Sequence, residues 1–507
     1  MRTLVTADPR DLSSSEYNRV TLWAPAYQAA PLALHALGMS WGNALRVLIL
    51  TCLVLGSLGW FFYFRFFVRG KCALAVIMLV MLCSAFTLDT ATCYQGGDLL
   101  LWTTAPFLIT LNVLAMRTER FLAGLILTLI GGFCAIAVYV IKFSGIFLGL
   151  GLMVAWGLQV FLSRRNKRKL PAWISGAILG VVFLFLCGAI GGYTAVSSAG
   201  SKLDFKGGFA VLGLWPTAMT DLSMLIASVW GKLHLPRDKI DAVISFTGWL
   251  LIAGLALLAF ERKTDLFSSA KDNLRNLITP AVFVALCVIA TDTLMYVAVV
   301  LISSHVSIDA RLARISGLLA LPMVFVLTGR CLSQSRGAVR VITYCLILVL
   351  FVFPPVFGVA RLASQLWQFY PSRGKIASDE QLVNQHFGFQ DDAKNFVREL
   401  RARIPSQKTI LYTTYATNLF FCPAQRCLLV EAVEMFSTDE LRKANYPRPP
   451  AEGVALLLPL EFESNGKLIA IQSSFRDIHS WEYVPMKSVS DWTLWISHNE
   501  PNPSAQK

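Results

Sequence analysis

Four charged residues stand at the edges of long apolar runs, where their side chains could do chemistry. Asp98 opens one run in YQGGDLLLW, Lys142 lies in the short gap IKFSGI, and Arg311 and Arg314 begin another run. A spacing of three residues puts both guanidinium groups on one face of a helix, where they could fork onto a phosphate. The cations therefore favour a site for an anionic phosphate, to which a helix start adds favourable polarity.

Each of these residues also has a structural explanation. Asp98 follows a glycine turn and is as well suited to cap a helix as to catalyse. Lys142 could extend its amine to the membrane surface, and the arginine pair could be balanced by Asp309. Asp292, between two threonines inside an apolar run, could join a polar contact between helices or face a water-filled cavity. Its role stays open.

Ten apolar runs of membrane-spanning length surround these residues. They cover residues 44–68, 72–88, 98–116, 121–141, 143–162, 172–193, 240–260, 278–303, 312–331 and 339–360. Cations follow the odd-numbered runs, namely Arg65, Arg69, Lys71, Arg117, Arg120, Arg164, Arg165, Lys167, Arg168, Lys169, Arg262, Lys263, Lys271, Arg275, Arg330, Arg336 and Arg340. Alternate loops are thus predicted to be cytoplasmic.

The opposite, exported face then holds Asp98, Lys142, Arg311 and Arg314, together with residues 1–43, the loop 194–239 and all of 361–507. The loop 194–239 mixes lysines with apolar stretches, which fits a segment lying on the membrane or covering a lipid groove. Export of residues 1–43 requires a span or signal ahead of them. We therefore expect a helix upstream of Met1.

Composition supports a polytopic membrane protein. The chain has 507 residues, of which 55% are hydrophobic and 15% charged, and its mean hydropathy is +0.58. Its net charge of +14 sits largely in predicted cytoplasmic loops, where it orients helices and meets lipid headgroups, so no nucleic-acid partner is expected. Without a phosphate-binding loop or dinucleotide fingerprint, no directly bound nucleotide is expected either.

Residues 361–507 differ in composition and are predicted to form a small exported α/β domain. Residues 391–404 have helical periodicity, and short β-like runs follow at 410–414, 427–430, 454–460 and 492–497. Cys422 and Cys427 could form a disulfide in an oxidising compartment. The fold class is therefore an all-α membrane domain, 44–360, with an exported segment before it and this domain after it.

Four stretches, in this order, resemble motifs of the GT-C superfamily of membrane glycosyltransferases, which includes protein O-mannosyltransferases and aminoarabinose transferases. Residues 21–27, running into 31–38, are similar to the segment Trp-x-Pro-x-Tyr that closes the first external loop. Residues 97–102 resemble an acidic motif at a helix start, 141–145 a basic and aromatic turn ending in Gly, and 309–322 an Arg-Tyr-Leu-x-Pro helix start. Leu312 replaces the tyrosine, and the proline is shifted.

The resemblance implies an enzyme that moves a sugar from a polyprenyl-phosphate lipid to a cell-envelope acceptor, on the exported face of a bacterial plasma membrane. It implies that Asp98 assists the acceptor or a divalent metal, and that Lys142, Arg311 and Arg314 hold the donor phosphate. The catalytic acid of the first loop would fall upstream of Met1. Asp8, Asp11 and Glu16 are weaker candidates for that acid.

Two other classes fit parts of the pattern. A transporter or flippase would be favoured by paired, inverted halves with broken helices, and the sequence shows no such repeat. A GT-C-like scaffold without catalysis would fit the missing first-loop acid. The sequence does not specify the sugar or the acceptor.

Overall fold

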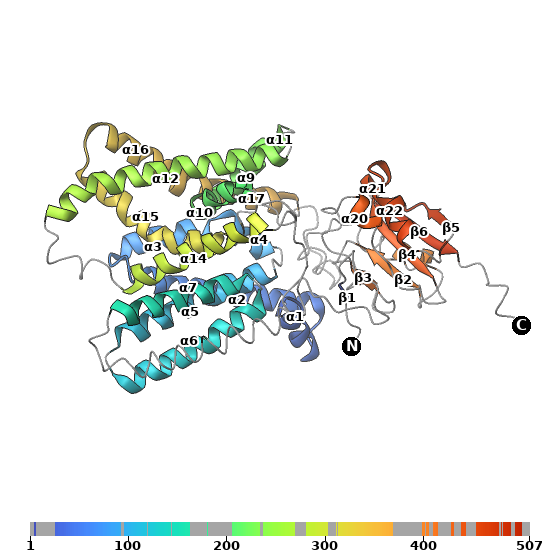
Figure 1. Ribbon diagram of the computed structural model, residues 1–507, viewed down its shortest axis with the longest axis horizontal. Coiled ribbons are helices and arrows are strands. Elements are labelled where there is room, and N and C mark those ends of the chain that lie inside the picture. The colour runs from blue at the N-terminus through green and yellow to red at the C-terminus, as the bar shows by residue number, and fades with distance from the viewer. Residues whose placement is uncertain are drawn as a thin grey trace, which may run out of the picture. The chain divides into compact units, whose positions relative to one another are not determined.

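A computed structural model describes most of the apolar runs and the strands of the tail (Figure 1). The described residues are 5–6, 26–92, 96–118, 120–142, 144–162, 180, 205–233, 237–268, 280–302, 311, 313–368, 398–400, 402–404, 409–413, 427–429, 438–442, 453–475, 478, 480–487 and 492–498. The chain divides into two compact units. One comprises residues 23–188 and 198–376, and the other residues 1–22, 189–197 and 377–507.

The first unit is helical. Its described elements are α1 (Ala26–Ala36), α2 (Trp41–Phe64), α3 (Lys71–Leu82), α4 (Ala85–Thr92), α5 (Gly97–Arg117), α6 (Phe121–Ile141), α7 (Gly145–Leu162), α9 (Phe205–Leu212), α10 (Leu214–Ala218), α11 (Leu222–Lys232), α12 (Arg237–Ser268), α14 (Pro280–Ile302), α15 (Arg314–Gln334), α16 (Gly337–Ile347), the π-helical turn η2 (Leu348–Val352) and α17 (Phe353–Gln368). Figure 1 shows the long helices running side by side as a bundle.

Seven helical segments in the described part are long and apolar enough to cross a membrane, or eight if one bent pair is counted as a single span. They coincide with seven of the ten predicted runs, those at 44–68, 98–116, 121–141, 240–260, 278–303, 312–331 and 339–360. The chain is therefore a polytopic membrane protein, as predicted. The run 143–162 contains the shorter apolar helix Gly145–Gln159. The run 172–193 lies outside the described residues except for Gly180, so the count of ten stays a prediction.

The predicted span 72–88 consists of two helices joined at a break. Its two halves, α3 and α4, are bent by 64°. At the break, side-chain hydroxyl groups take part in hydrogen bonds with the backbone. The Thr87 hydroxyl donates to the Met81 carbonyl at 3.0 Å, and the Thr87 amide donates to Ser84 Oγ at 3.4 Å. Such local hydrogen bonds compete with a continuous helical ladder. The bend turns α4 toward the candidate site.

The stretch 205–233 folds as three short helices, and α10 does not lie on the surface of the bundle. Its residues Leu214, Pro216, Thr217 and Ala218 are buried, and α10 packs against α12 and α15. Gly213 and Gly248 make the contact with α12 possible, because a Cβ on Gly248 would overlap the Gly213 carbonyl. Apolar residues of a segment expected on the membrane surface thus contribute to the core.

The second unit contains a six-stranded sheet. Its strands are β1 (Val5–Thr6), β2 (Ile410–Thr413), β3 (Cys427–Leu429), β4 (Val454–Pro459), β5 (Ser480–Val484) and β6 (Trp492–His498), in the order β1-β3-β2-β4-β6-β5. Strands β1, β3, β2 and β4 pair in parallel, and β6 pairs antiparallel with both of its neighbours, β4 and β5. The short helices α20 (Thr438–Arg442), α21 (Glu461–Ser464) and α22 (Lys467–Ser474) accompany them.

Alternate residues of β4 supply the two cores of this sheet. Leu456 and Leu458 belong to a cluster with Phe462 and Ile471, whereas Leu457 packs on the other face. A strand buried on both faces has a continuous apolar sequence. The run VALLLP of β4 has this pattern, and the sequence therefore predicts the strand. The strands predicted near 410, 427, 454 and 492 are present, and β1 and β5 were not predicted. Cys422 lies outside the described residues.

Candidate functional site

Asp98 and Lys142 form an ion pair between the start of α5 and the end of α6. The Lys142 Nζ lies 2.5 Å from Asp98 Oδ1, and both side chains are largely buried. Gly97 permits this approach, since a Cβ there would meet the Ile141 carbonyl at 3.0 Å. Gly96 is the cap residue of α5, and no side chain caps that helix. The carboxylate of Asp98 therefore binds the lysine rather than capping its own helix.

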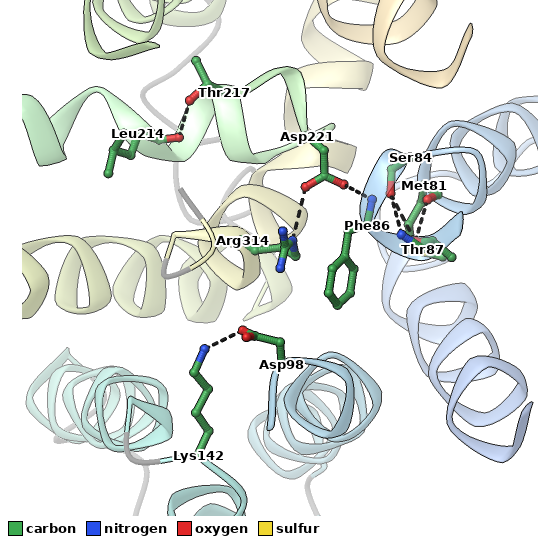
Figure 2. Close-up of polar contacts among 10 residues, drawn as sticks. All are labelled: Met81, Ser84, Phe86, Thr87, Asp98, Lys142, Leu214, Thr217, Asp221 and Arg314. Atoms are coloured by element: carbon green, nitrogen blue, oxygen red, sulfur yellow. Dashed lines mark hydrogen bonds and ion pairs between the residues drawn. The ribbon is translucent and has the colours of Figure 1, made fainter. Parts of the chain in front are cut away.

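Arg314 forms a second and more deeply buried ion pair. Its Nε lies 3.2 Å from Asp221 Oδ1, and the two residues are only 6% and 4% exposed. The second oxygen of Asp221 accepts the Phe86 amide at 3.1 Å. The Phe86 ring packs against the guanidinium, and the distance from Arg314 Cζ to the centre of the ring is 3.8 Å. Figure 2 shows Arg314 held by an acid from one element and a ring from another.

The guanidinium of Arg314 has a hydrogen-bond donor that Asp221 does not use. Its Nη1 is buried and has no hydrogen-bond partner in the described part of the chain. Buried donors almost always find a partner, so an unmatched one calls for an explanation such as a missing ligand. Arginine is suited to phosphate because its planar fork can donate two parallel hydrogen bonds.

The two ion pairs belong to one electrostatic cluster. The positive charges of Lys142, Arg314 and Arg311 all act on the Asp98 carboxylate. Figure 2 shows Arg314 on the side of Asp98 and Lys142 that faces Asp221. The structure thus brings together the four residues that the sequence had singled out, from three different helices or their ends.

Arg311 differs from the sequence expectation. Helix α15 begins at Arg314 with Ala313 as its cap, so Arg311 precedes the helix instead of sharing one of its faces. The Arg314 amide donates to the Arg311 carbonyl at 3.3 Å, which defines a turn. Arg311 is exposed, whereas Arg314 is buried. The expectation of two equivalent guanidinium groups on one helix face is therefore wrong.

Asp292 lies within α14 and accepts a hydrogen bond from the Ser316 hydroxyl of α15. The charge of Lys142 also acts on its carboxylate. Asp292 is therefore connected to the same cluster, and a polar contact between helices, one of the two alternatives left open by the sequence, is present.

Some of the sequence candidates cannot be placed. Asp8, Asp11, Glu16 and Asp309 lie outside the described residues. In the part of the chain that the structure describes, no group of three or more His, Cys, Asp or Glu side chains is arranged to hold a metal ion.

Sequence reasoning missed Asp221 and Phe86. Asp221 lies in the loop 194–239, whose lysines and apolar residues indicate a segment on the membrane or over a lipid groove. No local pattern marks Asp221 as the partner of Arg314, 93 residues away. Phe86 falls within the apolar run 72–88, where the sequence predicts a continuous span. A second acid missed in this way is Asp89 of α4, which pairs with Arg361 of α17 at 2.9 Å.

No protein-family model and no curated protein matches the sequence. Some solved structures align with most of this chain at low sequence identity. ArnT from Cupriavidus metallidurans bound to undecaprenyl phosphate aligns at 11% identity with a TM-score of 0.47, over 98% of this chain and 94% of that one. Its apo form aligns at 12% identity with a TM-score of 0.44, over the same shares.

An oligosaccharyltransferase from Archaeoglobus fulgidus, in complex with Zn and sulfate, aligns at 12% identity with a TM-score of 0.45. This match covers 94% of the present chain and 65% of the other.

Proposed function

We propose that this protein transfers a sugar from a polyprenyl-phosphate-linked donor to a cell-envelope acceptor, on the exported face of the membrane. The observation that carries the proposal is the convergence of Asp98, Lys142 and Arg314 from different helix ends, with one buried guanidinium nitrogen unpartnered in the described part of the chain. A carboxylate beside several cations provides a base and an anion site in one place.

The reaction would break the bond between the anomeric carbon and the donor phosphate. An acceptor hydroxyl or amine would form the new bond to that carbon, and the polyprenyl phosphate would leave with the electron pair of the broken bond. Arg314, Lys142 and Arg311 would stabilise the charge that develops on the leaving phosphate. Asp98 would take the proton of the acceptor, directly or with the help of a divalent metal.

The ion pair between Asp98 and Lys142 fits both roles. The lysine is hydrogen-bonded to the carboxylate oxygen that would accept the proton. A donor phosphate that attracted the ammonium would release this oxygen for the acceptor. Binding of the donor would in this way prepare the base for the second substrate.

The test is transfer of label in proteoliposomes that contain the purified full-length chain. A panel of polyprenyl-phosphate sugars, tritiated in the sugar, is supplied with an envelope extract as the source of acceptor. Label should move into the acceptor fraction with the wild-type chain and fall by about 100-fold or more with Asp98→Asn. Label that stays on the donor throughout, or that crosses the bilayer on an intact donor, would overturn the proposal, and the second result would indicate a flippase.

A further inference from the structure

Asp221 adopts an unusual backbone conformation directly behind Arg314. Its φ is 58° and its ψ 28°, and within the described ranges it is the one non-glycine residue with a positive φ. Left-handed conformations disfavour side chains with a Cβ, and Asp tolerates them better than most residues. Such conformations persist where the surrounding structure requires them, often at functional sites.

The side chain of Asp221 does not cap the helix that follows it. Asp221 precedes α11 as its cap residue, yet its carboxylate makes no capping hydrogen bond to that helix. Its two carboxylate oxygens instead accept the Arg314 Nε and the Phe86 amide. The turn thus gives up a local hydrogen bond and directs the carboxylate toward two other elements, α15 and α4 (Figure 2).

These contacts fix the orientation of the guanidinium. Asp221 holds the Nε edge, and the Phe86 ring covers one face. The Nη1, which has no partner in the described part of the chain, is thereby left available. An arginine held at one edge and one face can offer its remaining donors in a single direction, which is how its planar fork recognises phosphate.

We propose that Asp221 is a positioning residue, which orients Arg314 so that its outer nitrogens meet the phosphate of the lipid donor. This inference rests on the proposed function, because it takes the anion to be that phosphate. Asp221 itself does not touch the substrate. The left-handed turn matters because it brings the carboxylate to Arg314.

The test measures binding of farnesyl phosphate, a short polyprenyl monophosphate, to the purified full-length chain by calorimetry in detergent. Farnesol is the uncharged control. Asp221→Asn keeps the shape and tolerates the left-handed backbone, but it loses the charge and one acceptor. Asp221→Gly relieves the backbone and removes the carboxylate altogether. Both should bind farnesyl phosphate roughly tenfold more weakly, the scale on which residues that orient a ligand-binding side chain act.

Arg314→Lys keeps the positive charge without the fork, and it should also lose affinity by roughly tenfold. In the double variant Asp221→Asn with Arg314→Lys, the losses should not add, because both changes disable the same oriented group. A lysine that binds as well as the arginine, or losses that add fully, would overturn the positioning role. The Arg314→Lys result also stands if the Asp221 variants do not fold.

Three further outcomes separate this inference from the proposed function. Wild-type affinity in both Asp221 variants, with binding lost in Arg314→Ala, would overturn the positioning role and leave the phosphate site intact. Wild-type affinity in Arg314→Ala would overturn both assignments of Arg314. Equal binding of farnesol and farnesyl phosphate would show that the isoprenoid alone is recognised, and it would overturn the phosphate site as well.

Asp89→Asn is the matched control. Asp89 is also a buried acid, 7% exposed, and it accepts the Nε of an arginine, Arg361, at 2.9 Å. The substitution removes the same charge from an ion pair whose arginine side chain is 37% exposed, against 7% for Arg314. It should lower the thermal stability and leave the affinity for farnesyl phosphate unchanged. An equal loss of affinity in Asp89→Asn would mean that the effect of Asp221→Asn reflects general destabilisation, and the inference would fail.

Discussion

At the scale of single residues, the site combines charges that differ in how far they are buried. Arg314 and Asp221 are removed from solvent, whereas Arg311 is exposed. A buried ion pair that loses one member leaves an uncompensated charge, which costs far more than the loss of an exposed contact. The cations of the site should therefore respond differently to the same substitution.

Arg311→Ala should lower turnover by about tenfold, because a cation near the leaving phosphate is lost, while the thermal midpoint in detergent stays close to wild type. Arg314→Ala should abolish turnover and also lower stability by roughly 3 kcal/mol, because Asp221 is left buried without its partner. Activity assays and thermal unfolding of both variants check this contrast. Equal stability of the two variants would contradict the burial argument.

Variants of the ion pair between Asp98 and Lys142 can separate its contribution to stability from its contribution to turnover. Either Asp98→Asn or Lys142→Met alone leaves a largely buried partner unpaired and should destabilise the protein. The double variant removes both charges and should regain most of that stability. Its turnover should stay as low as that of the single variants. Recovery of turnover together with stability would show that the pair only supports the fold.

At the scale of elements, close contacts between helices bring the charged groups together. Gly317 of α15 is one such contact, since a Cβ there would lie 2.7 Å from the backbone of Met219, two residues before Asp221. Arg314 and Asp221 meet because these two segments approach at a glycine. The backbone atoms opposite cannot rotate away as a flexible side chain would.

Gly317→Ala should therefore separate α15 from the turn at Asp221, lower stability by roughly 2 kcal/mol and weaken binding of farnesyl phosphate. Gly329→Ala is the control on the same helix, because a Cβ there meets nothing within 4 Å. It should be neutral or slightly stabilising, since alanine favours a helix more than glycine does. Thermal unfolding and calorimetry measure both effects. A normal Gly317→Ala protein would contradict the role of the contact.

The sequence predicted these elements unequally. Long apolar runs such as 98–116 and 121–141 specify helices by composition alone, so their ends, which place Asp98 and Lys142, were close to correct. The bend at Ser84 depends on hydroxyl groups whose competition with the helix is not visible in hydropathy. The pairing of Arg314 with Asp221 arises from packing across 93 residues, and no local pattern encodes it. The edge strand β5 is mostly exposed, and its sequence SWEYV lacks the continuous apolar run that marks a buried strand.

At the scale of the whole molecule, the proposed chemistry requires that the site lies on the exported side, and the sequence predicts that the tail lies on that side as well. The cations that follow alternate spans predict this orientation. Alkaline phosphatase fused after Lys507 should be active, because it folds only when exported, and a fusion after Arg117 should be inactive. Fusions to green fluorescent protein at the same two positions should give the opposite pattern. An inactive phosphatase at Lys507 with an active one at Arg117 would invert the orientation.

The central claim is that the cluster around Arg314 and Asp98 cleaves a lipid-linked sugar phosphate. The most direct measurement follows the donor phosphorus by ³¹P NMR, with proteoliposomes, a polyprenyl-phosphate sugar and the envelope extract that supplies the acceptor. We predict that the phosphodiester signal is replaced by that of a polyprenyl phosphomonoester with the wild-type chain, and that this conversion is lost in Arg314→Ala and in Asp98→Asn. A phosphodiester that persists with the folded wild-type chain across the donor panel, or conversion that continues in both variants, would contradict the account.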